Sequence, residues 1–494
     1  MVALSKILNE MTVSELHLNK QDILHVDEDI FVLPGDLVID GHGAIIEGNG
    51  SNKLQIENSN ITLKNLALRN FHTVINIDGK GQNVENIRVE NCVFENYRAY
   101  GVLIASTLSN STVQNIKILD SVFNGPVKSS MGHDDVVAGV YGVMIQAAYI
   151  PDESDVENCV LHDITVDHCR AYRGNRCAVW LSGITSPDLT SGVPTGRYGK
   201  ARNIHISGIT ITNNDFHDCG DATINLISAM GGQDDTIVED VNISNNVIEQ
   251  GIWGIFVIAG EPLIDGTRNI CLRNVTIDRN TIYPFKRGVG EATYGIAVMA
   301  GRNDYFPNVH VENCLTENIK IRQNSIRDLT TGIIVAAADC LVDGDDCVLR
   351  NCKIQNIEID GNRISNVTYG VKLLATWMEG RAFDYMIDVP PRNHTWVPFK
   401  ENHRDVTVVA EDNSISNVVI KGNILDGYRF QYMATGAYAF GHCRVNRNRL
   451  TNVITENNTF INGEGHVHIL DEILHDYVIG CDNSVDAELR WSLN

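Results

Sequence analysis

Acidic side chains gather in one short stretch of the chain, ITITNNDFHDCGDATINL at residues 209–226. Its second half brings Asp215, His217, Asp218 and Asp221 close together in the sequence. A carboxylate beside a base or a second carboxylate can act as a general acid or base, because neighbouring charges tune its protonation. This stretch is therefore the first place to look for chemistry.

The first half of the stretch belongs to a repeat that recurs along the chain. Its template is (Val/Ile)-x-(Ile/Val)-x-x-Asn-x-(Ile/Phe), followed after a few residues by Gly-(Ile/Val)-x-(Val/Ile)-x-Ala. Apolar residues alternate with period two in both halves, which predicts β-strands rather than helices. VNISNNVIEQGIWGIFVIAG at 241–260 matches throughout, and other copies begin at Ile87, Ile116, Ile164, Ile209, Val275, Ile319, Ile357, Val418 and Val453.

One asparagine recurs at the same place in the repeat, at positions 214, 246, 280, 324, 362, 423 and 458. At a turn that every coil repeats, stacked amides can bond to buried backbone groups above and below. The patterns of leucine-rich repeats and propellers are absent. The sequence therefore predicts an all-β fold, a single-stranded right-handed parallel β-helix (a solenoid) of ten or more coils with capped ends.

The ends of a repeat array must be covered, which suggests where the domains begin and end. We expect an N-terminal cap over residues 1–20, with a helix at the apolar LSKILNEM of 4–11. The β-helix with its loop insertions should cover 21–470, and a C-terminal cap 471–494.

These repeats, with FVLPGDLVIDGHGAIIEGNG at 31–50, resemble the pectin-lyase-like superfamily of right-handed parallel β-helix proteins. That superfamily includes polysaccharide lyases, polygalacturonase-type hydrolases, epimerases and phage tailspikes. The resemblance covers roughly residues 20–470 and matches no specific family. It implies the fold, whereas the activity has to be argued from a site.

Long insertions interrupt the repeat on both sides of its Gly-(Ile/Val)-x-(Val/Ile) strand. One set follows the strand, with its longest member at 376–414, and the other precedes it, at 124–142 and 283–295. Such loops should border a groove along the sheet that this strand forms, and in the superfamily that the chain resembles this sheet carries the active-site groove. The outward residues are apolar, so loops, a second subunit or stacked sugar rings should cover them. They are Met144, Trp180, Asn225, Phe256, Ala297, Ile334 and Lys372.

Asp221 is the leading catalytic candidate because it lies at the start of this strand, with Arg176 expected beside it on the preceding coil. An ion pair between coils is the alternative interpretation. GDATINL also resembles the Gly-Asp-Asp segment of polygalacturonase-type hydrolases, in which Asp221 matches the first Asp and Ala222 replaces the second. Glycoside hydrolysis needs two carboxyl groups about 5–9.5 Å apart. The candidates for the second catalytic carboxylate, all on loops, are Asp134, Asp135 and Glu261.

Arginines and aromatic residues gather around the same loops. The predicted substrate-binding residues are Arg176, Trp180, Arg287, Arg302, Trp377 and Arg381. In a lyase or epimerase, arginine or Ca²⁺ would neutralise a uronate carboxylate, and GGQDD at 231–235 could supply calcium ligands. For a hydrolase no cofactor is expected. No metal site is predicted, since no histidine pair follows Cys347 and Cys352.

His217 and Asp215 align with Glu249, Tyr283 and Arg327 of other coils, on a different sheet from the groove. We therefore expect them to be ordinary surface residues. Only Asp221 remains a candidate from the opening stretch.

The formal net charge of −23 argues against nucleic acid as a partner and weakens the case for a strongly polyanionic substrate. No apolar run reaches the length of a membrane span, and no secretory signal is visible. We expect a cytoplasmic protein, or a secreted one if a leader has been removed.

Cys92 and Cys169 replace the repeated Asn, which predicts small buried side chains rather than disulfides. Self-association into a homo-oligomer stays open.

The sequence favours a carbohydrate-active enzyme: a glycoside hydrolase or transglycosidase that acts on oligosaccharides in the groove with paired carboxylates. A lyase or epimerase acting on uronate sugars is the second hypothesis. A non-catalytic carbohydrate-binding or tailspike-like protein is the third. Hydrolysis adds water to the products, β-elimination does not, and a binding protein forms no products.

Overall fold

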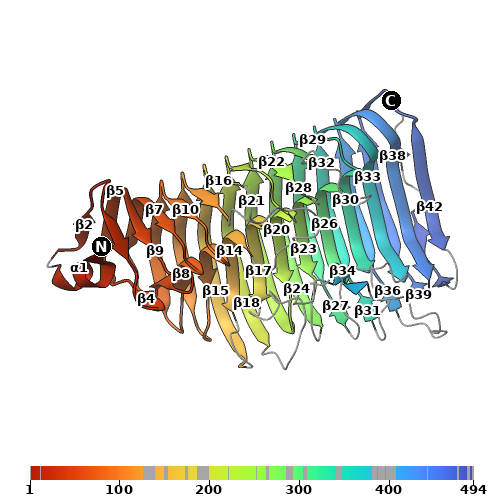
Figure 1. Ribbon diagram of the computed structural model, residues 1–494. Coiled ribbons are helices and arrows are strands. Elements are labelled where there is room, and N and C mark those ends of the chain that lie inside the picture. The colour runs from red at the N-terminus through yellow and green to blue at the C-terminus, as the bar shows by residue number, and fades with distance from the viewer. Residues whose placement is uncertain are drawn as a thin grey trace.

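The computed structural model shows an elongated solenoid in which each coil of the chain lies on the coil before it (Figure 1). Its strands join in one parallel sheet system, apart from a short antiparallel pair, β34 (Met386–Ile387) and β35 (Thr395–Trp396). The predicted all-β parallel β-helix is confirmed by this pairing. The structure describes residues 2–11, 13–125, 140–149, 154–172, 176–185, 200–220, 222–251, 253–262, 266–284, 293–303, 309–340, 347–380, 386–387, 395–396, 408–441, 443–474, 478–486 and 490–491.

Three strand positions recur in the coils. The strand that follows the repeat glycine forms what we call the site sheet, the sheet that the long insertions border. Its strands, in order of pairing, are β4 (Ile30–Val32), β6 (Lys53–Ile56), β8 (Thr73–Asp78), β11 (Tyr100–Ala105), β14 (Tyr141–Tyr149), β17 (Cys177–Thr185), β20 (Ala222–Ala229), β23 (Trp253–Gly260), β26 (Tyr294–Asn303), β30 (Thr331–Cys340), β33 (Arg363–Gly380), β38 (Ile424–Gly441) and β42 (His466–Leu474).

The long row carries the Ile-x-Ile half of the repeat. It consists of β2 (Glu15–His17), β3 (Ile23–His25), β5 (Leu37–Glu47), β7 (Ile61–Arg69), β9 (Asn83–Glu90), β12 (Thr112–Leu119), β15 (Val156–Asp167), β18 (Ala201–Thr212), β21 (Gln233–Ser244), β24 (Thr267–Asp278), β28 (Leu315–Arg322), β32 (Lys353–Asp360), β37 (Ser414–Lys421) and β40 (Arg449–Glu456). Shorter strands extend it in the later coils: β27 (His310–Glu312), β31 (Cys347–Arg350), β36 (Val408–Glu411), β39 (Cys443–Asn446) and β43 (Ile479–Cys481).

The third row is short and follows the asparagine turn. It contains β10 (Val93–Glu95), β13 (Val122–Asn124), β16 (Arg170–Ala171), β19 (Asp215–Phe216), β22 (Val247–Gln250), β25 (Thr281–Pro284), β29 (Ser325–Arg327), the first residues of β33 and β38, and β41 (Thr459–Ile461). Inward residues of the three rows stack on one another from coil to coil. In the site sheet, for example, Val179 pairs with Ile224 and Ile224 with Ile255, and all three are buried in the core. Regular stacking of apolar side chains is what keeps every coil in register.

The repeated asparagines form the predicted ladder. Asn280 donates from Nδ2 to the Ile243 carbonyl at 2.9 Å and to Asn324 Oδ1 at 3.0 Å, and its own Oδ1 accepts from the Asn246 amide at 3.0 Å. The preceding residue, Arg279, has a left-handed backbone with φ of 52°, which turns the chain between two rows. The turn is therefore satisfied entirely inside the coil stack.

A second ladder, which the repeat did not predict, joins Asn413, Asn448 and Asn483 at the other end of the long row. Cys352 begins it, since its amide donates to Asn413 Oδ1 at 2.9 Å. Both turns thus use the same device of a buried amide following a left-handed residue.

Replacing Asn280 with alanine should lower the free energy of unfolding by about 2–4 kcal/mol, because an amide, a carbonyl and a neighbouring side chain lose their partners inside the protein. Urea denaturation followed by circular dichroism measures this. Thr276→Ala, on the same coil but on a half-buried strand position, is the matched control and should cost less than about 1 kcal/mol. Equal losses in both variants would show that the ladder adds nothing beyond strand propensity.

All twelve cysteines are free thiols, and all lie in the described part of the chain. Cys92 and Cys169 are buried at ladder positions, as predicted, and the Cys169 amide donates to Asn214 Oδ1 at 2.8 Å. Burial raises the pKa of both thiols to about 12. These cysteines therefore serve packing and have little thiolate character.

The first coil is covered by α1 (Leu4–Glu10), which follows β1 (Val2–Ala3), and Leu4 is fully buried in the core. At the other end the strand pairing continues through β44 (Ser484–Val485) and β45 (Arg490–Trp491). The domain boundaries stay a prediction. Among the described residues no helix has the length and apolar character of a membrane span.

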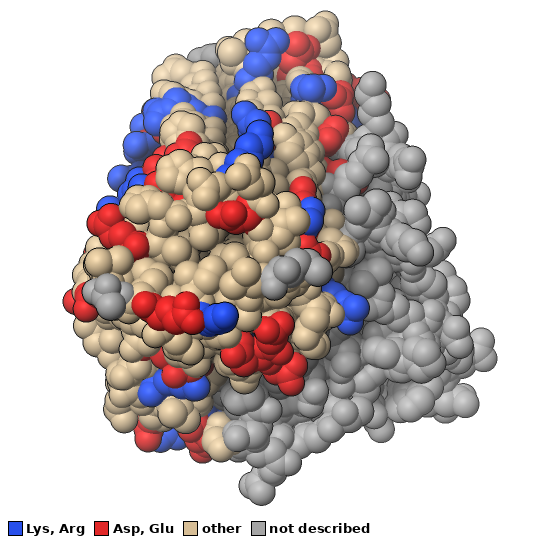
Figure 2. Space-filling model, turned by 60° about the vertical axis from the view of Figure 1, so that its left-hand side comes forward, with Lys and Arg blue, Asp and Glu red and all other residues tan. Residues whose placement is uncertain are grey.

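Cations and carboxylates of neighbouring coils pair across the outside of the long row. Arg273 Nη2 lies 2.6 Å from Glu239 Oε2, and the hydrogen bond from Arg273 holds the pKa of Glu239 below its ordinary value. The face shown in Figure 2 likewise mixes acidic and basic side chains rather than collecting one sign. Exposed pairs of this kind stabilise the fold only slightly, by less than about 1 kcal/mol each.

Candidate functional site

The outer face of the site sheet is a second hydrophobic cluster, separate from the core inside the coils. The outward residues Met144, Trp180 and Phe256 are 1%, 5% and 1% exposed. Asn225, Ala297 and Ile334 are also buried, whereas Lys372 is half-buried. These outward residues are therefore covered in this structure, although they point away from the core inside the coils.

Trp180 and Arg176, both predicted to bind substrate, come together on this face. The Arg176 guanidinium carbon lies 5.5 Å from the centre of the Trp180 ring. The ring also meets Tyr141 edge-on, with centroids 5.0 Å apart. Trp180 pairs in register with Met144 on one side and Asn225 on the other. A cation, two aromatic rings and an amide thus share one small area.

Several polar atoms in this apolar face have no hydrogen-bond partner among the described residues. They are Nε2 and Oε1 of Gln146, Nε1 of Trp180, Oδ1 of Asn225 and Nε1 of Trp253. Gln146 is fully buried, on the same strand as Met144 and facing the same side. Leaving such groups unbonded costs about 1–3 kcal/mol each, so a ligand that bonds to those on this face would recover that energy.

A buried ionic triad lies further along the same face. Arg302 Nη1 lies 2.6 Å from Glu261 Oε1, and Arg302 Nε lies 3.1 Å from Asp339 Oδ2. The three side chains are 4%, 3% and 2% exposed for Glu261, Arg302 and Asp339. Arg302 and Asp339 are register partners on β26 and β30, and Glu261 directly follows β23. Three consecutive coils each contribute one charge.

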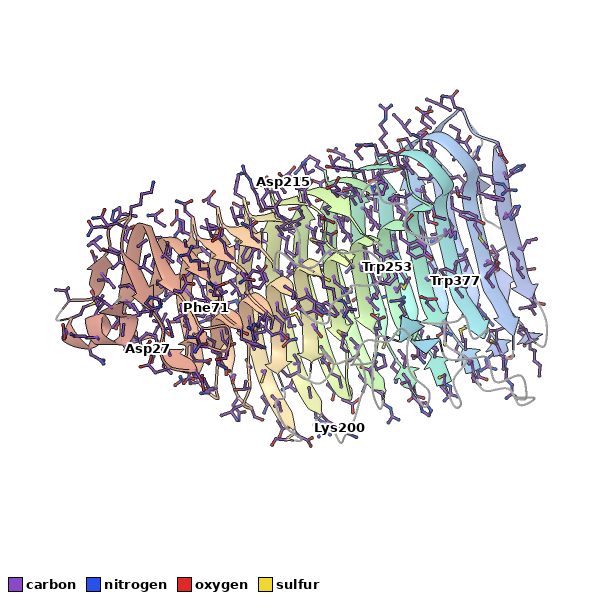
Figure 3. All side chains as sticks on the ribbon, in the orientation of Figure 1. Asp27, Phe71, Lys200, Asp215, Trp253 and Trp377 are labelled. Atoms are coloured by element: carbon purple, nitrogen blue, oxygen red, sulfur yellow. The ribbon has the colours of Figure 1, made fainter. Side chains whose placement is uncertain are left out.

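Aromatic rings enclose the triad. The Arg302 guanidinium carbon lies 5.1 Å from the Trp253 ring centre and 5.0 Å from that of Phe256. Trp377 is the register partner of Asp339 on the next coil and meets Tyr294 edge-on at 6.3 Å. Figure 3 shows Trp253 and Trp377 in the middle of the same sheet. Rings over a guanidinium replace part of its hydration and hold it flat between the carboxylates.

Buried ion pairs cost desolvation energy, and apolar residues of similar size often stabilise a fold as well or better. The triad therefore needs a reason beyond stability. The guanidinium contacts both carboxyl groups, so the arrangement holds two acidic side chains close together on one face. Paired carboxylates in a site that excludes water are suited to acid–base and nucleophilic chemistry.

The structure thus brings Glu261 to Arg302, and Arg176 to Trp180, with Trp377 one coil beyond the triad. Sequence reasoning missed Asp339, Gln146 and Trp253. The other predicted residues, Asp221, Asp134, Asp135, Arg287 and Arg381, lie outside the described residues, and their roles stay predictions.

His217 and Asp215 lie on the short row, as predicted, and Figure 3 places Asp215 at the upper margin, away from Trp253. His217 Nε2 is 2.6 Å from Asp215 Oδ1, and Nδ1 is 3.2 Å from Glu249 Oε2. The ring stacks on Tyr172 at 5.9 Å. These contacts are those of a surface ion-pair network.

A hollow of about 220 Å³ lies where the insertions after the site sheet enter the long row. It is lined by Asp155, Val156, Glu157, Lys200, Ala201, Arg202, Gly232, Gln233, Asp234, Gly266 and Arg268. Three carboxylates and three cations share this lining, which includes no predicted catalytic or substrate-binding residue. We therefore place the candidate site on the outer face of the site sheet, where the unpartnered polar atoms and the triad are.

No protein-family model matches the sequence. The curated proteins include no match either. Among solved structures, the chain is similar to the surface protein and adhesin PfbA of Streptococcus pneumoniae, at 12% identity, TM-score 0.35, 97% of this chain and 94% of that one. It is similar to a PL6 alginate lyase in complex with a trisaccharide (12%, 0.33, 98% and 85%). It is also similar to the Family 28 exopolygalacturonase of Yersinia enterocolitica (9%, 0.35, 99% and 75%). Similarities of this size carry no argument about activity.

Proposed function

We propose that the protein is a carbohydrate-active enzyme, a glycoside hydrolase or transglycosidase that acts on oligosaccharides at the outer face of the site sheet. The observation that carries the proposal is the set of unpartnered polar atoms around Gln146, Trp180 and Asn225, next to aromatic rings. Sugars offer C–H faces that stack on such rings and hydroxyls that both donate and accept hydrogen bonds. An oligosaccharide can therefore satisfy an apolar face that contains isolated donors and acceptors.

The triad would supply the chemistry. Neighbouring strands lie about 4.8 Å apart, so Glu261 and Asp339, two coils apart, start from backbones roughly 10 Å apart and converge on Arg302. That brings them toward the carboxyl separation of glycoside hydrolases, about 5–9.5 Å. Glu261, whose contact to Arg302 is 2.6 Å, is the candidate for the base or nucleophile. Asp339 is the candidate for the second carboxyl group, and Asp221, Asp134 and Asp135 are the alternatives.

Arg302 also bears on the choice between hydrolase and lyase. A lyase needs a cation to neutralise the uronate carboxylate, but Arg302 already bridges two protein carboxylates. The other described arginine among the predicted residues, Arg176, lies over the Trp180 ring. A binding protein would need the aromatic face but not the costly triad. Hydrolysis therefore accounts for more of the site than the other two functions do.

The outward residues are buried in this structure, so the proposal requires a form of the protein in which they meet substrate. The proposed function predicts that the protein cleaves oligosaccharides. The test incubates a panel of neutral and uronate oligosaccharides with wild type, Glu261→Gln and Asp221→Asn, and analyses the products by mass spectrometry. Products that contain one added water, lost in Glu261→Gln, support the proposal. Products without water on uronates favour a lyase, and retention without any product favours a binding protein.

Gln146→Met separates binding from folding. Methionine has a similar length but no amide, so the free energy of unfolding should rise by about 1–2 kcal/mol as the unbonded polar atoms are removed. The apparent affinity for the substrate should fall roughly tenfold, by about 1.4 kcal/mol. Urea denaturation and KM measurements check the two effects.

The matched control is Gln114→Met, because the Gln114 amide contacts Glu85 and His162 on the long row. This variant should not gain stability or lose substrate affinity. If Gln146→Met destabilised the protein, the amide would have a partner in solution and would not be waiting for a ligand.

A further inference from the structure

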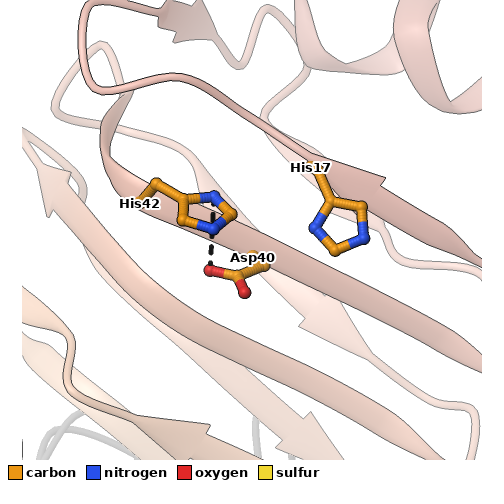
Figure 4. Close-up of side chains that lie close together, drawn as sticks. All are labelled: His17, Asp40 and His42. Atoms are coloured by element: carbon orange, nitrogen blue, oxygen red, sulfur yellow. Dashed lines mark ion pairs between the residues drawn. The ribbon is translucent and has the colours of Figure 1, made fainter.

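A cluster of possible metal ligands lies in the first coils, near the N-terminal end of the molecule. His17 ends β2 and is the register partner of Asp40 on β5, and His42 follows two residues later. One nitrogen or oxygen atom from each of the three side chains lies within 4.8 Å of the others. Figure 4 shows the two imidazoles on either side of the Asp40 carboxylate. The cluster therefore spans two consecutive coils.

The backbone of β5 is irregular where the cluster forms. His42 has a left-handed φ of 48°, Gly43 has a φ of 92°, and the register with β7 shifts between Asp40 and Ala44. Asn65 and Asn86 have the same left-handed conformation in the next two coils, so this bend is a regular feature of the long row that turns the His42 side chain toward Asp40. His42 Nδ1 lies 3.1 Å from the Leu18 carbonyl, which fixes the ring next to Asp40.

Asp40 is held as a metal-ligating carboxylate usually is, by hydrogen bonds to its oxygens. Oδ1 accepts from Asn65 Nδ2 at 2.8 Å and faces His42 Nδ1 at 3.6 Å, whereas Oδ2 lies 3.0 Å from Lys64 Nζ. One carboxylate oxygen of Asp40 therefore faces His42, and the other faces Lys64. Such outer partners orient ligands and are part of most metal sites.

We propose that His17, Asp40 and His42 bind a divalent transition-metal ion such as Zn²⁺. Two imidazoles and one carboxylate suit zinc, nickel and copper and not calcium or magnesium, which require an oxygen shell. The imidazole side chains are 59% and 56% exposed, so an ion reaches them directly from solvent. Glu15, whose Oε2 lies 3.4 Å from His17 Nε2, is placed to supply a further oxygen. Repulsion from Lys64 limits the affinity.

The ion would tie the first coil to the second. β2 has only three residues, and it pairs in parallel with the beginning of β5. Short end strands fray before the rest of a repeat array unfolds. An ion that binds only the paired form adds stability in proportion to the logarithm of its concentration above the dissociation constant. The site would therefore act as a clasp on the N-terminal end.

The test uses the full chain, freed of metal with a chelator, and titrates it with Zn²⁺ in a calorimeter. The wild type should bind one ion with a micromolar dissociation constant, and His17→Ala and His42→Ala should each weaken that binding by about 10–100-fold. His168→Ala, which removes another exposed histidine beside an aspartate, is the control and should leave the binding unchanged. Zn²⁺ should also raise the melting temperature of wild type and of His168→Ala, but not of the His17→Ala/His42→Ala double variant.

Binding that is absent from wild type, or that the control weakens as much as the cluster variants do, would overturn the assignment. So would equal stabilisation by Ca²⁺ or Mg²⁺. Metal-free melting curves of the variants show whether they are folded, since these exposed side chains contribute little packing. None of these readings depends on sugar cleavage, so the metal site and the proposed function stand or fall separately.

Discussion

Arg302→Met is expected to lower the free energy of unfolding by about 3–5 kcal/mol, a larger loss than that expected for Asn280→Ala. The variant leaves the Glu261 and Asp339 carboxyl groups buried near each other, with no cation between them. Methionine keeps most of the volume between Trp253 and Phe256, so lost packing contributes little. Urea denaturation followed by circular dichroism measures the change.

Two comparisons isolate the electrostatic cause. The triple variant Glu261→Gln/Arg302→Met/Asp339→Asn removes all three charges and should recover most of the stability, as neutralised ion networks do. Arg273→Met breaks a similar contact of 2.6 Å to Glu239 on the half-exposed long row and should cost about 1 kcal/mol or less. If the triple variant were as unstable as the single one, packing and not charge would hold the three residues together.

Glu261→Gln is expected to reduce kcat by about 10³-fold or more, with little change in KM. Glutamine keeps the shape and still accepts a hydrogen bond from Arg302, but it neither carries the negative charge nor takes up a proton. A loss confined to kcat is the sign of a group that acts in the transition state. Initial rates on the best substrate of the oligosaccharide panel provide the measurement.

Glu249→Gln is the matched control, since that carboxylate contacts His217 on the short row, away from the site sheet. It should leave kcat unchanged. Full activity in Glu261→Gln would make the triad a structural device of the outer face, and the search for the catalytic acid would return to Asp221, Asp134 and Asp135. Loss of folding is excluded beforehand by comparing melting temperatures.

The coil repeat could be predicted from the sequence because each coil meets the same physical demands. Asn280 and its equivalents solve one problem, that of a buried turn, in the same way every time. Once the repeat is aligned, the triad also has a signal. Glu261, Arg302, Asp339 and Trp377 all stand seven residues after the repeat glycine, at Gly254, Gly295, Gly332 and Gly370. Equal offsets place them in one row.

Other parts of the candidate sites could not be predicted. Whether an outward side chain is exposed to solvent or buried depends on residues far away in the sequence. The sequence around Gln146 therefore does not predict that its amide is buried without hydrogen-bond partners. His17 and Asp40 come together only because β2 pairs with β5 in one particular register, and His42 joins them through an irregular backbone. Register and backbone irregularity follow from the packing of whole strands, not from the residues of one motif.

The one-charge-per-coil construction of the triad has an evolutionary consequence. Because coils stack by pairing only with their neighbours, duplication or loss of a whole coil is a change that the fold tolerates. A coil inserted between Arg302 and Asp339 would move the two charges apart by one strand spacing, about 4.8 Å, without altering any other residue. A lineage of such proteins can therefore alter the reach of its reactive groups in discrete steps, by recombination of repeats instead of by point substitution.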